Sequence, residues 1–442
     1  MFCDANKIVA KYLQRFYTIT RGERIMNESK TLEFKENILS NTFLKTVSAF
    51  ANYRTGQIIF GVADNGAVLG IPSPESACLS IENKINDSIK PSPEYTLKIQ
   101  ENSTILLTVY EGLYKPYLYK GKAYKRNDTS TIEIERLEYN RLILEGRNQS
   151  FEELPSPEQD LTFSRLEQEF IRIMGIQQLN RDILKTLELY SDKEGFNNAA
   201  ALLSDHNRFK GIDIIRFGES IDEIMDRETF DGISVLSQLE KSVQIFRKYY
   251  QYEKIEGTSR KTIDKIPEKA FREVIANALV HRLWDIDASI KISMFADRLE
   301  VRSPGGLPAG ISKEEYLNGQ ISLLRNPILG NVFFRLKHIE KFGTGILRIN
   351  NAYASALEKP AFHIFENSIT VVLPVMIGDN SLTDTEKRIV DLLKKNYVMS
   401  RQELEKATGL KKDSVIRLLN SLIGRNIIQK TGKGRGIRYS LL

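Results

Sequence analysis

Residues 27–37 read NESKTLEFKEN, a short charged stretch that contains three glutamates, Glu28, Glu33 and Glu36. Leu32 and Phe34 alternate with polar residues, and this alternation predicts a strand with one buried side. On that interpretation Glu33 points away from the apolar side. Glu28 and Glu33 then either belong to a solvated charged face or supply part of a metal-binding site.

The residues that follow continue an alternation of helix and strand. Residues 41–52 (NTFLKTVSAFAN) carry large apolar side chains at helical spacing, which predicts a helix with one buried face. Residues 57–71 (QIIFGVADNGAVLGI) predict a strand, an Asp-Asn-Gly turn and a second strand. We expect these elements to belong to one α/β domain.

Three motifs in this region carry a family resemblance. ESKTLEFKEN (28–37), VSAFANYRTG (47–56) and IIFGVADNGAVLGI (58–71) occur in this order. Together they resemble the Schlafen-type AlbA-like domain over about residues 26–135. In animal Schlafen proteins this domain is an RNA-cleaving nuclease with three carboxylates. The resemblance assigns these catalytic and metal-binding roles to Glu28, Glu33 and Asp64.

The chemistry of such a site is that of hard divalent cations. Mg²⁺ or Mn²⁺ prefers oxygen ligands, and clustered carboxylates hold the ion against a phosphate. Glu28 and Glu33 are five positions apart, so a straight strand would place them on opposite faces and a bend is needed between them. The alternative is that Asp64 only serves its own turn and that Glu33 pairs with a lysine.

Residues 114–131 (YKPYLYKGKAYKRNDTST) interleave tyrosines with lysines and an arginine. Aromatic rings stack on bases while cations contact phosphates, so this pattern favours nucleic-acid contact. The expected contacts are Lys120, Lys122, Lys125 and Arg126. The alternative is a strand whose tyrosines lie in the core.

A second set of motifs lies between residues 266 and 350. Residues 266–285 (IPEKAFREVIANALVHRLWD) predict a helix with Glu273, Asn277 and His281 along one face. Residues 290–310 then predict two strands followed by a glycine-rich loop. A second pair of glycines opens the helix predicted near the end of this region.

These pieces resemble the RecG-C-terminal-like branch of the gyrase and histidine-kinase (GHKL) ATPase fold. The resemblance implies ATP and Mg²⁺ as cofactors, with Asn277 as a magnesium ligand and Glu273 as the residue that activates water if ATP is hydrolysed. The implied cofactor-binding residues are Asn277, Gly305, Gly306, Gly343 and Gly345. Ser303 stands where the wider family has an aspartate that reads adenine. The alternative is a cradle kept for dimerisation or domain docking.

The last 59 residues predict a compact unit. Thr383 with Glu386, and Ser400 with Glu403, form two capping-box patterns that start helices. A third helix follows, and then two short strands around a Gly-Lys-Gly-Arg-Gly turn. The order resembles the winged helix-turn-helix of bacterial regulators, in which the third helix enters the major groove and the wing contacts phosphates. The expected DNA contacts are Lys411, Lys412, Ser414, Arg417, Lys433 and Arg435. The alternative is a winged helix used for protein contacts.

Charge and composition narrow the class of protein. The 442 residues carry a net charge of +6, and residues 411–442 contain eight basic residues against one acidic residue. Such a basic end is an electrostatic footprint for nucleic acid. No segment approaches the ~20 apolar residues of a membrane span, and the two cysteines predict no disulfide framework. We therefore expect a cytoplasmic protein.

The expected fold class is α+β with several domains, joined by linkers at residues 153–160 and 377–384. The predicted parts are an N-terminal helix (1–25), an AlbA-like α/β domain (26–150), a mostly helical middle segment (151–262), a GHKL-like α/β sandwich (263–376) and a winged helix-turn-helix (382–442).

Two functions remain open at this point. The first is a DNA-binding transcriptional regulator that also binds ATP. The second is a metal-dependent, Schlafen-like nuclease that cleaves RNA or DNA, in antiviral defence. DNA is the main expected partner, with RNA as a further one, and no membrane. We also expect a homo-oligomer, because winged-helix proteins usually pair over two half-sites.

Overall fold

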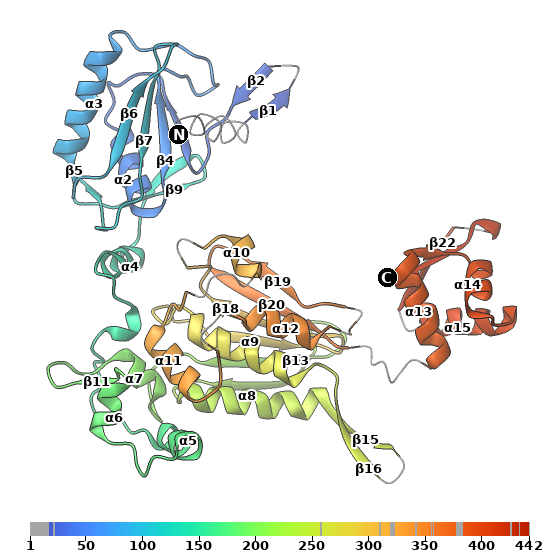
Figure 1. The fold of residues 1–442 in the computed structure, drawn as a ribbon. Coiled ribbons are helices and arrows are strands. Elements are labelled where there is room, and N and C mark those ends of the chain that lie inside the picture. Colours follow the sequence, from blue (N-terminus) through green and yellow to red (C-terminus); the bar gives the residue numbers. More distant parts are fainter. Residues whose placement is uncertain are drawn as a thin grey trace, which may run out of the picture. The chain divides into compact units, whose positions relative to one another are not determined.

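The computed structural model describes residues 17–20, 23–256, 259–308, 311–318, 323–340, 343–354, 356, 358–376, 383–424, 427–432 and 434–441. The chain divides into two compact units, Met1–Leu154 and Pro155–Leu442. The division falls inside the stretch expected to be the first linker. The mixed α+β, multidomain class is confirmed (Figure 1).

The N-terminal unit is built on a four-stranded sheet (Figure 1). Its strands, in spatial order, are β3 (Leu32–Lys35), β4 (Gly56–Phe60), β7 (Ile105–Val109) and β6 (Tyr95–Ile99). β3 and β4 are parallel, and the other pairs are antiparallel. The helices α2 (Phe43–Tyr53) and α3 (Pro74–Ser88) share one hydrophobic core with the sheet.

The predicted helix and strand pack as their apolar patterns indicate. Phe43 of α2 meets Phe60 of β4 edge to face, with ring centroids 5.2 Å apart, and both are fully buried. A Cβ on Gly56 would lie 2.4 Å from the ring of Phe50, so a glycine is needed where β4 begins beneath α2. The phenylalanines thus hold the helix tightly on the sheet.

The remaining elements of this unit are short. They are β1 (Tyr17–Thr20), β2 (Glu23–Met26), β5 (Ile89–Lys90), β8 (Leu118–Tyr119), β9 (Tyr124–Asn127), β10 (Ser130–Glu133), α4 (Arg136–Gly146) and a 3-10 turn (Phe151–Glu153).

Two predictions about this unit are corrected. Most of the N-terminal helix predicted over residues 1–25 lies outside the described residues, but β1 and β2 pair as an antiparallel hairpin where it should have ended. The second strand expected after the Asp-Asn-Gly turn is also missing from the described structure, where only an isolated bridge joins Val62 to Val68. Exposure of Val68 and Leu69 explains this, since neither has a core to pack against.

The second unit contains a six-stranded mixed sheet (Figure 1). Its strands, in spatial order, are β14 (Ile224–Phe230), β13 (Ile212–Phe217), β17 (Ile290–Met294), β18 (Arg298–Pro304), β20 (Ser368–Pro374) and β19 (Ala361–Ile364). Only the pair β13 and β17 is parallel among these strands.

Three helices cover one face of this sheet: α8 (Val235–Tyr250), α9 (Glu268–His281) and α12 (Gly345–Ala352) (Figure 1). Phe246 of α8 stacks on Phe271 of α9 with ring centroids 4.4 Å apart, and both rings are fully buried. Two short helices complete this region: α10 (Lys313–Asn318) and α11 (Pro327–Arg335).

The boundary predicted between a helical middle segment (151–262) and a separate sandwich (263–376) is wrong. β13 and β14 lie in the supposed middle segment, yet they form one end of the six-stranded sheet. The other elements before the sheet are α5 (Ser164–Met174), α6 (Arg181–Thr186), β11 (Tyr190–Ser191), β12 (Gly195–Phe196) and α7 (Asn198–Leu203). A two-stranded hairpin, β15 (Gln251–Glu256) and β16 (Ser259–Asp264), connects α8 to α9.

The C-terminal residues form three helices and a three-stranded sheet. They are α13 (Asp384–Asn396), β21 (Val398–Met399), α14 (Arg401–Thr408), α15 (Lys412–Gly424), β22 (Ile428–Thr431) and β23 (Arg438–Leu441), with the strands in the order β21-β23-β22. Both predicted capping boxes are present, at Thr383 and Ser400. We refer to residues 383–441 as the C-terminal module. No helix in the described part of the chain is long and apolar enough to cross a bilayer.

Candidate functional sites: a charge cluster, a glycine-rich pocket and a basic helix

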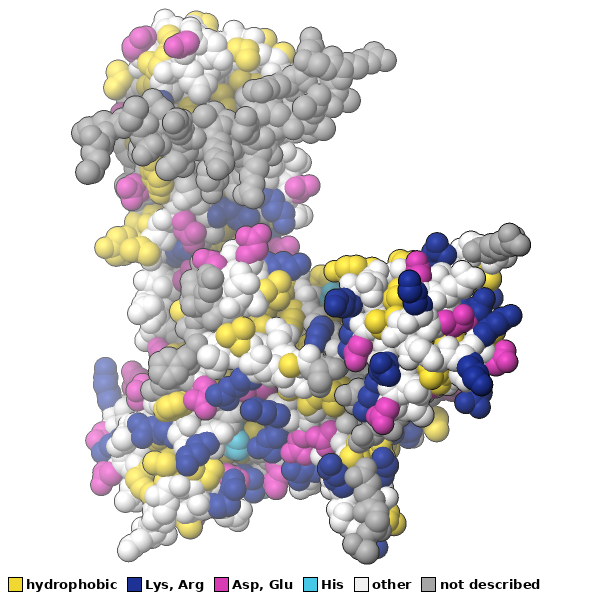
Figure 2. All heavy atoms as spheres, turned by 45° about the vertical axis from the view of Figure 1, so that its right-hand side comes forward, with side chains coloured by type: hydrophobic (Ala, Val, Ile, Leu, Met, Phe, Trp, Pro, Cys, Tyr) yellow, Lys and Arg dark blue, Asp and Glu magenta, His cyan; other side chains and the backbone are white. Residues whose placement is uncertain are grey.

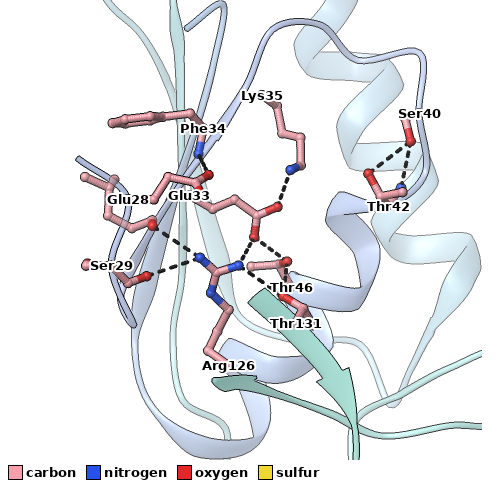
Figure 3. Close-up of polar contacts among 11 residues, drawn as sticks. Glu28, Ser29, Glu33, Phe34, Lys35, Ser40, Thr42, Thr46, Arg126 and Thr131 are labelled. Atoms are coloured by element: carbon pink, nitrogen blue, oxygen red, sulfur yellow. Dashed lines mark hydrogen bonds and ion pairs between the residues drawn. The ribbon is translucent and has the colours of Figure 1, made fainter. Parts of the chain in front are cut away.

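The carboxylate of Glu33 is enclosed by donors (Figure 3). Its Oε1 lies 2.5 Å from Nζ of Lys35, and its Oε2 lies 2.7 Å from Nη1 of Arg126. The hydroxyl of Thr46 on α2 donates to the same Oε2 at 2.5 Å. Glu33 is only 4% exposed, so the alternative that it belongs to a solvated charged face is wrong. The alternative of a lysine partner is found, together with an arginine that the sequence did not indicate as a partner.

Arg126 holds the β9–β10 hairpin against β3. Besides its bond to Glu33, its Nη2 donates to the carbonyl oxygens of Ser29 at 3.2 Å and Leu32 at 3.4 Å (Figure 3). Its side chain is 5% exposed. The expected role of Arg126 as a nucleic-acid contact is therefore not supported, because the guanidinium is used inside the domain.

The three carboxylates expected to share a metal ion do not come together. Glu28 accepts a hydrogen bond from the backbone N–H of Phe34 at 2.8 Å. Asp64 is exposed at the turn, where the neighbouring Asn65 accepts from the N–H of Ala67 at 3.0 Å. Within the described residues, no group of three or more His, Cys, Asp or Glu side chains is placed to hold a metal ion. The convergence that the nuclease interpretation requires is absent from this part of the chain.

Three of the four tyrosines in the Tyr- and Lys-rich stretch at 114–131 are buried, while Tyr114 is exposed. Tyr117, Tyr119 and Tyr124 belong to the hydrophobic core, which is the alternative that the sequence left open. Two of the expected cations are paired with acidic residues at 2.8 Å: Lys122 with Glu133, and Lys125 with Glu138. Lys120 is exposed, with its amine 5.4 Å from the ring of Tyr119. The base-stacking interpretation fails for Tyr117, Tyr119 and Tyr124, because their rings are packed in the hydrophobic core.

A glycine-rich pocket lies in the second unit, where α9, β18 and the start of α12 meet. Every residue that the sequence assigned to the nucleotide cradle lines it. Its polar and glycine lining comprises Glu273, Asn277, His281, Ser303, Gly305, Gly306, Arg325, Glu340, Gly343 and Gly345. The glycine residues come from two loops more than 35 positions apart in the chain, so the fold is needed to bring them together.

Glu273 and Asn277 form the polar wall of the pocket. They are one turn apart on α9, and the amide Nδ2 of Asn277 donates to Oε1 of Glu273 at 3.3 Å. A Cβ on Gly345 would lie 2.7 Å from both side chains, so a glycine lets α12 begin directly against them. Burial raises the pKa of Glu273, while Arg348, 3.8 Å away, opposes that effect. Amide and carboxylate oxygens suit Mg²⁺, so this pair fits the expected metal chemistry.

Arg325 closes the first glycine loop and was not identified from the sequence. Its guanidinium donates to the carbonyl oxygens of His281 at 2.8 Å and Gly306 at 2.9 Å. Gly305 has φ +104°, and a Cβ there would lie 2.6 Å from Nη1 of Arg325. The arginine therefore fixes the loop to the end of α9. Its position directly before the Asn-Pro pair that starts α11 is the local sequence signal that could have indicated it.

Other side chains also bond the carbonyls at the end of α9. Ser303, which stands in place of the family's aspartate, donates to the carbonyl of Ala278 at 3.2 Å. Asn326 donates to the carbonyl of Val280 at 2.7 Å. Burial, and then the charge of Arg325, lower the pKa of His281 to about 4. The pocket thus presents a neutral histidine and a hydroxyl at this end.

The third helix of the C-terminal module carries exposed cations. Val415 and Leu419 of α15 are buried, while Arg417 between them is exposed and lies on the opposite side. Lys411 and Lys412 are exposed at the start of the helix. No ion pair found among the described residues involves these three cations. Lys433 and the side chain of Arg435 lie outside the described residues. Figure 2 shows several Lys and Arg side chains on the visible face of this module, with acidic ones among them.

Comparison with known families gives two matches. A family model described as "Schlafen, AlbA_2" matches residues 28–135. Another, described as "Putative ATP-dependent DNA helicase recG C-terminal", matches residues 287–373. The second match begins after α9, so Glu273 and Asn277 lie outside it. No curated protein matches the sequence.

Two solved structures show distant similarity. The DIP2311 protein from Corynebacterium diphtheriae is 18% identical, with 99% of this chain and 97% of that chain covered and a TM-score of 0.46. The N-terminal domain of a RecG-related protein from Nitrosomonas europaea is 25% identical over 25% of this chain and 85% of that chain, with a TM-score of 0.18. Neither superposition establishes a shared fold. The family matches show that the chain carries a Schlafen AlbA_2 domain at residues 28–135 and an ATPase-type domain of the RecG C-terminal family at residues 287–373.

Proposed function

We propose that this protein is a DNA-binding regulator that binds duplex DNA through its C-terminal module and a nucleotide with Mg²⁺ in its glycine-rich pocket. The observation that carries the DNA-binding part is the set of exposed cations on α15, a helix whose other side is anchored in a core. The order of α13, α14 and α15, followed by the β22–β23 hairpin, matches the order expected of a winged helix and supports the proposal. In that arrangement the third helix enters the major groove.

Electrostatics supports DNA over a protein partner for this module. Lys412 and Arg417 point into solvent without an acidic partner among the described residues, so each is free to neutralise a phosphate. Each neutralised phosphate releases condensed counterions, which makes the affinity fall steeply with salt.

The experiment measures the affinity of the full chain for a fluorescent DNA duplex at several salt concentrations, by anisotropy. The double variant Lys412→Gln/Arg417→Gln should weaken binding and reduce the slope of log K against log salt by about 1.8, from ~0.9 per phosphate contact. Lys395→Gln removes an exposed cation from α13 of the same module and should leave the slope unchanged. An unchanged slope in the double variant would exclude α15 from the interface.

The nucleotide-binding part is supported by the pocket itself. Gly306 leaves room for a close backbone approach, since a Cβ there would lie 2.2 Å from the carbonyl oxygen of Glu366. Gly343 has φ +66° and stands just before α12, whose first backbone N–H groups suit a phosphate. Asn277 and Glu273 would hold the Mg²⁺ ion, which neutralises phosphate charge when bound.

The family's adenine-reading carboxylate is replaced by Ser303 in this chain. The proposal therefore specifies a nucleotide but not its base, and ATP is the first nucleotide to test. Nuclease activity has no specific observation in its favour, because the Glu33 carboxylate is already engaged by Arg126, Lys35 and Thr46.

A further inference from the structure

The helix α12 packs along α9 and brings an arginine to the polar wall of the glycine-rich pocket (Figure 1). Gly345, the first residue of α12, lies directly against Glu273 and Asn277. Arg348 follows three positions later, so it lies on the same side of the helix as Gly345. The close approach that the glycine permits therefore also places a guanidinium beside the two proposed magnesium ligands.

Arg348 bridges two carboxylates that line the pocket. Its Nη1 lies 3.8 Å from Oε2 of Glu273, and its Nη2 lies 2.9 Å from Oε1 of Glu340. The side chain of Glu273 is 9% exposed, whereas those of Arg348 and Glu340 are 33% and 47% exposed. The arginine thus pairs with one buried and one exposed carboxylate, and it stays accessible from solvent.

The charges around this wall decide which cation Glu273 can accept. Its Oε1 accepts a hydrogen bond from Asn277, while its Oε2 faces the guanidinium of Arg348. Lys269, one turn earlier on α9, also acts on Glu273 through its charge, but no ion pair found among the described residues joins the two. A divalent cation held by Glu273 and Asn277 would be repelled by Arg348, because like charges close together in a partly buried site are poorly screened.

We infer that Arg348 excludes a free divalent cation from Glu273 and Asn277, so that this pocket takes Mg²⁺ as a complex with the nucleotide phosphates. Phosphate oxygens carry the negative charge that neutralises both cations, and a guanidinium pairs with phosphate as well as with carboxylate. Arg348 is therefore a ligand-binding residue that exchanges a carboxylate partner for a phosphate group. The inference rests on the proposed nucleotide function and specifies its ligand as a metal–polyphosphate complex.

The first test titrates the full chain with Mn²⁺ alone, as a probe for Mg²⁺, and measures free Mn²⁺ by electron paramagnetic resonance. Arg348→Gln should bind Mn²⁺ about tenfold more tightly than the wild type, because loss of the guanidinium frees the carboxylate for another cation. Arg348→Lys keeps a cation and should bind Mn²⁺ as weakly as the wild type does. Lys269→Gln removes a nearby charge that makes no contact with Glu273, and should change the affinity much less. Adding Glu273→Gln to Arg348→Gln should abolish the gain, which locates the site.

The second test measures the affinity of the same proteins for Mg-ATP by calorimetry. Arg348→Gln should bind Mg-ATP several-fold more weakly, because the phosphates lose their guanidinium partner. The expected effects on Mn²⁺ and on Mg-ATP have opposite signs, whereas damage to the fold would weaken both. Thermal melting checks the fold, and if Arg348→Gln does not fold, Arg348→Met keeps the aliphatic stem and makes the same comparisons.

The outcomes separate this inference from the proposed nucleotide site. If the wild type binds Mg-ATP but Arg348→Gln shows no gain in Mn²⁺ affinity, the inference is overturned and nucleotide binding stands. An equal gain in Lys269→Gln also overturns it, because the effect would then be that of general charge. If Arg348→Gln gains Mn²⁺ affinity but binds Mg-ATP as the wild type does, the exchange with phosphate is overturned. If that gain appears while the wild type binds no nucleotide, exclusion of the free ion is supported and the proposed nucleotide function fails.

Discussion

Glu33 and Arg126 lie 93 residues apart in the chain and meet in one buried ion pair. A buried carboxylate with a guanidinium, an ammonium and a hydroxyl around it has little capacity left for a metal ion. The same two residues looked like a metal ligand and a nucleic-acid contact when only their neighbours in sequence were considered. Their structural role is to fasten the β9–β10 hairpin to β3.

The first residue-scale prediction concerns this pair. Arg126→Met leaves Glu33 buried without its main partner, and breaking a buried pair in this way should lower the free energy of unfolding by about 3 kcal/mol. Lys122→Met removes a partner of Glu133 in a pair that is half exposed, and should leave the unfolding midpoint almost unchanged. Urea denaturation of both variants gives the comparison. Equal urea midpoints for the two variants would mean that the buried Glu33–Arg126 pair does not stabilise the domain.

The second residue-scale prediction concerns the pocket. Asn277→Ala should weaken binding of Mg-ATP on the order of tenfold or more, equivalent to ~1.4 kcal/mol or more, because it removes a proposed magnesium ligand. Asn331→Ala, on α11 and outside the pocket lining, is the matched control and should bind as the wild type does. Isothermal calorimetry with and without Mg²⁺ measures both. The same affinity in wild type and Asn277→Ala would dismiss the proposed nucleotide site.

At the scale of elements, local sequence signals placed helix ends accurately in the C-terminal module. Ser400 accepts a hydrogen bond from the N–H of Glu403, whose carboxylate in turn accepts from the N–H of Ser400 at 2.6 Å. Gly409 ends α14 with φ +72°, as its position predicts. These signals work because a helix terminus satisfies its backbone groups with residues only three or four positions away.

The element-scale prediction follows from this capping box. Ser400→Ala removes the side-chain acceptor at the start of α14 and should destabilise the C-terminal module by about 1 kcal/mol. Thr431→Ala, an exposed position on β22, should have a much smaller effect. Thermal unfolding followed by circular dichroism compares the two. If both variants melt alike, the cap contributes little to the stability of the module.

At the scale of the whole molecule, two half-buried histidines make stability depend on pH. Burial, and then the charge of Arg325, lower the pKa of His281 to about 4, and burial is also the main cause that lowers the pKa of His338 to about 4. Both histidines take up a proton more readily after unfolding, where the ordinary pKa is 6.5. The unfolded chain therefore binds more protons between these two values, so stability falls as the pH is lowered through this window.

The whole-molecule prediction is a loss of stability of the second unit between pH 7 and pH 5. Each histidine contributes at most about 1.4 kcal/mol per pH unit below its unfolded pKa. In His338→Gln the stability should fall less steeply with decreasing pH. His363→Gln changes a histidine at an exposed position and should show the same pH dependence as the wild type. Melting temperatures measured across this range test it. A His338→Gln protein with the wild-type pH dependence would show that His338 does not contribute to the loss of stability at low pH.

The sequence alone determined the fold class, most helices and strands, and the capping boxes of the C-terminal module, and its resemblance to known families indicated most, but not all, of the residues around the glycine-rich pocket. Those features depend on periodicity and on backbone conformations that glycine permits, which neighbouring residues specify. Only the tertiary structure decided that β13 and β14 complete the six-stranded sheet, that the tyrosines after residue 114 are internal, and that Arg126 occupies the Glu33 carboxylate. These outcomes depend on which distant residues pack together, because burial and charge pairing are set by contacts across the fold and leave no local pattern in the chain.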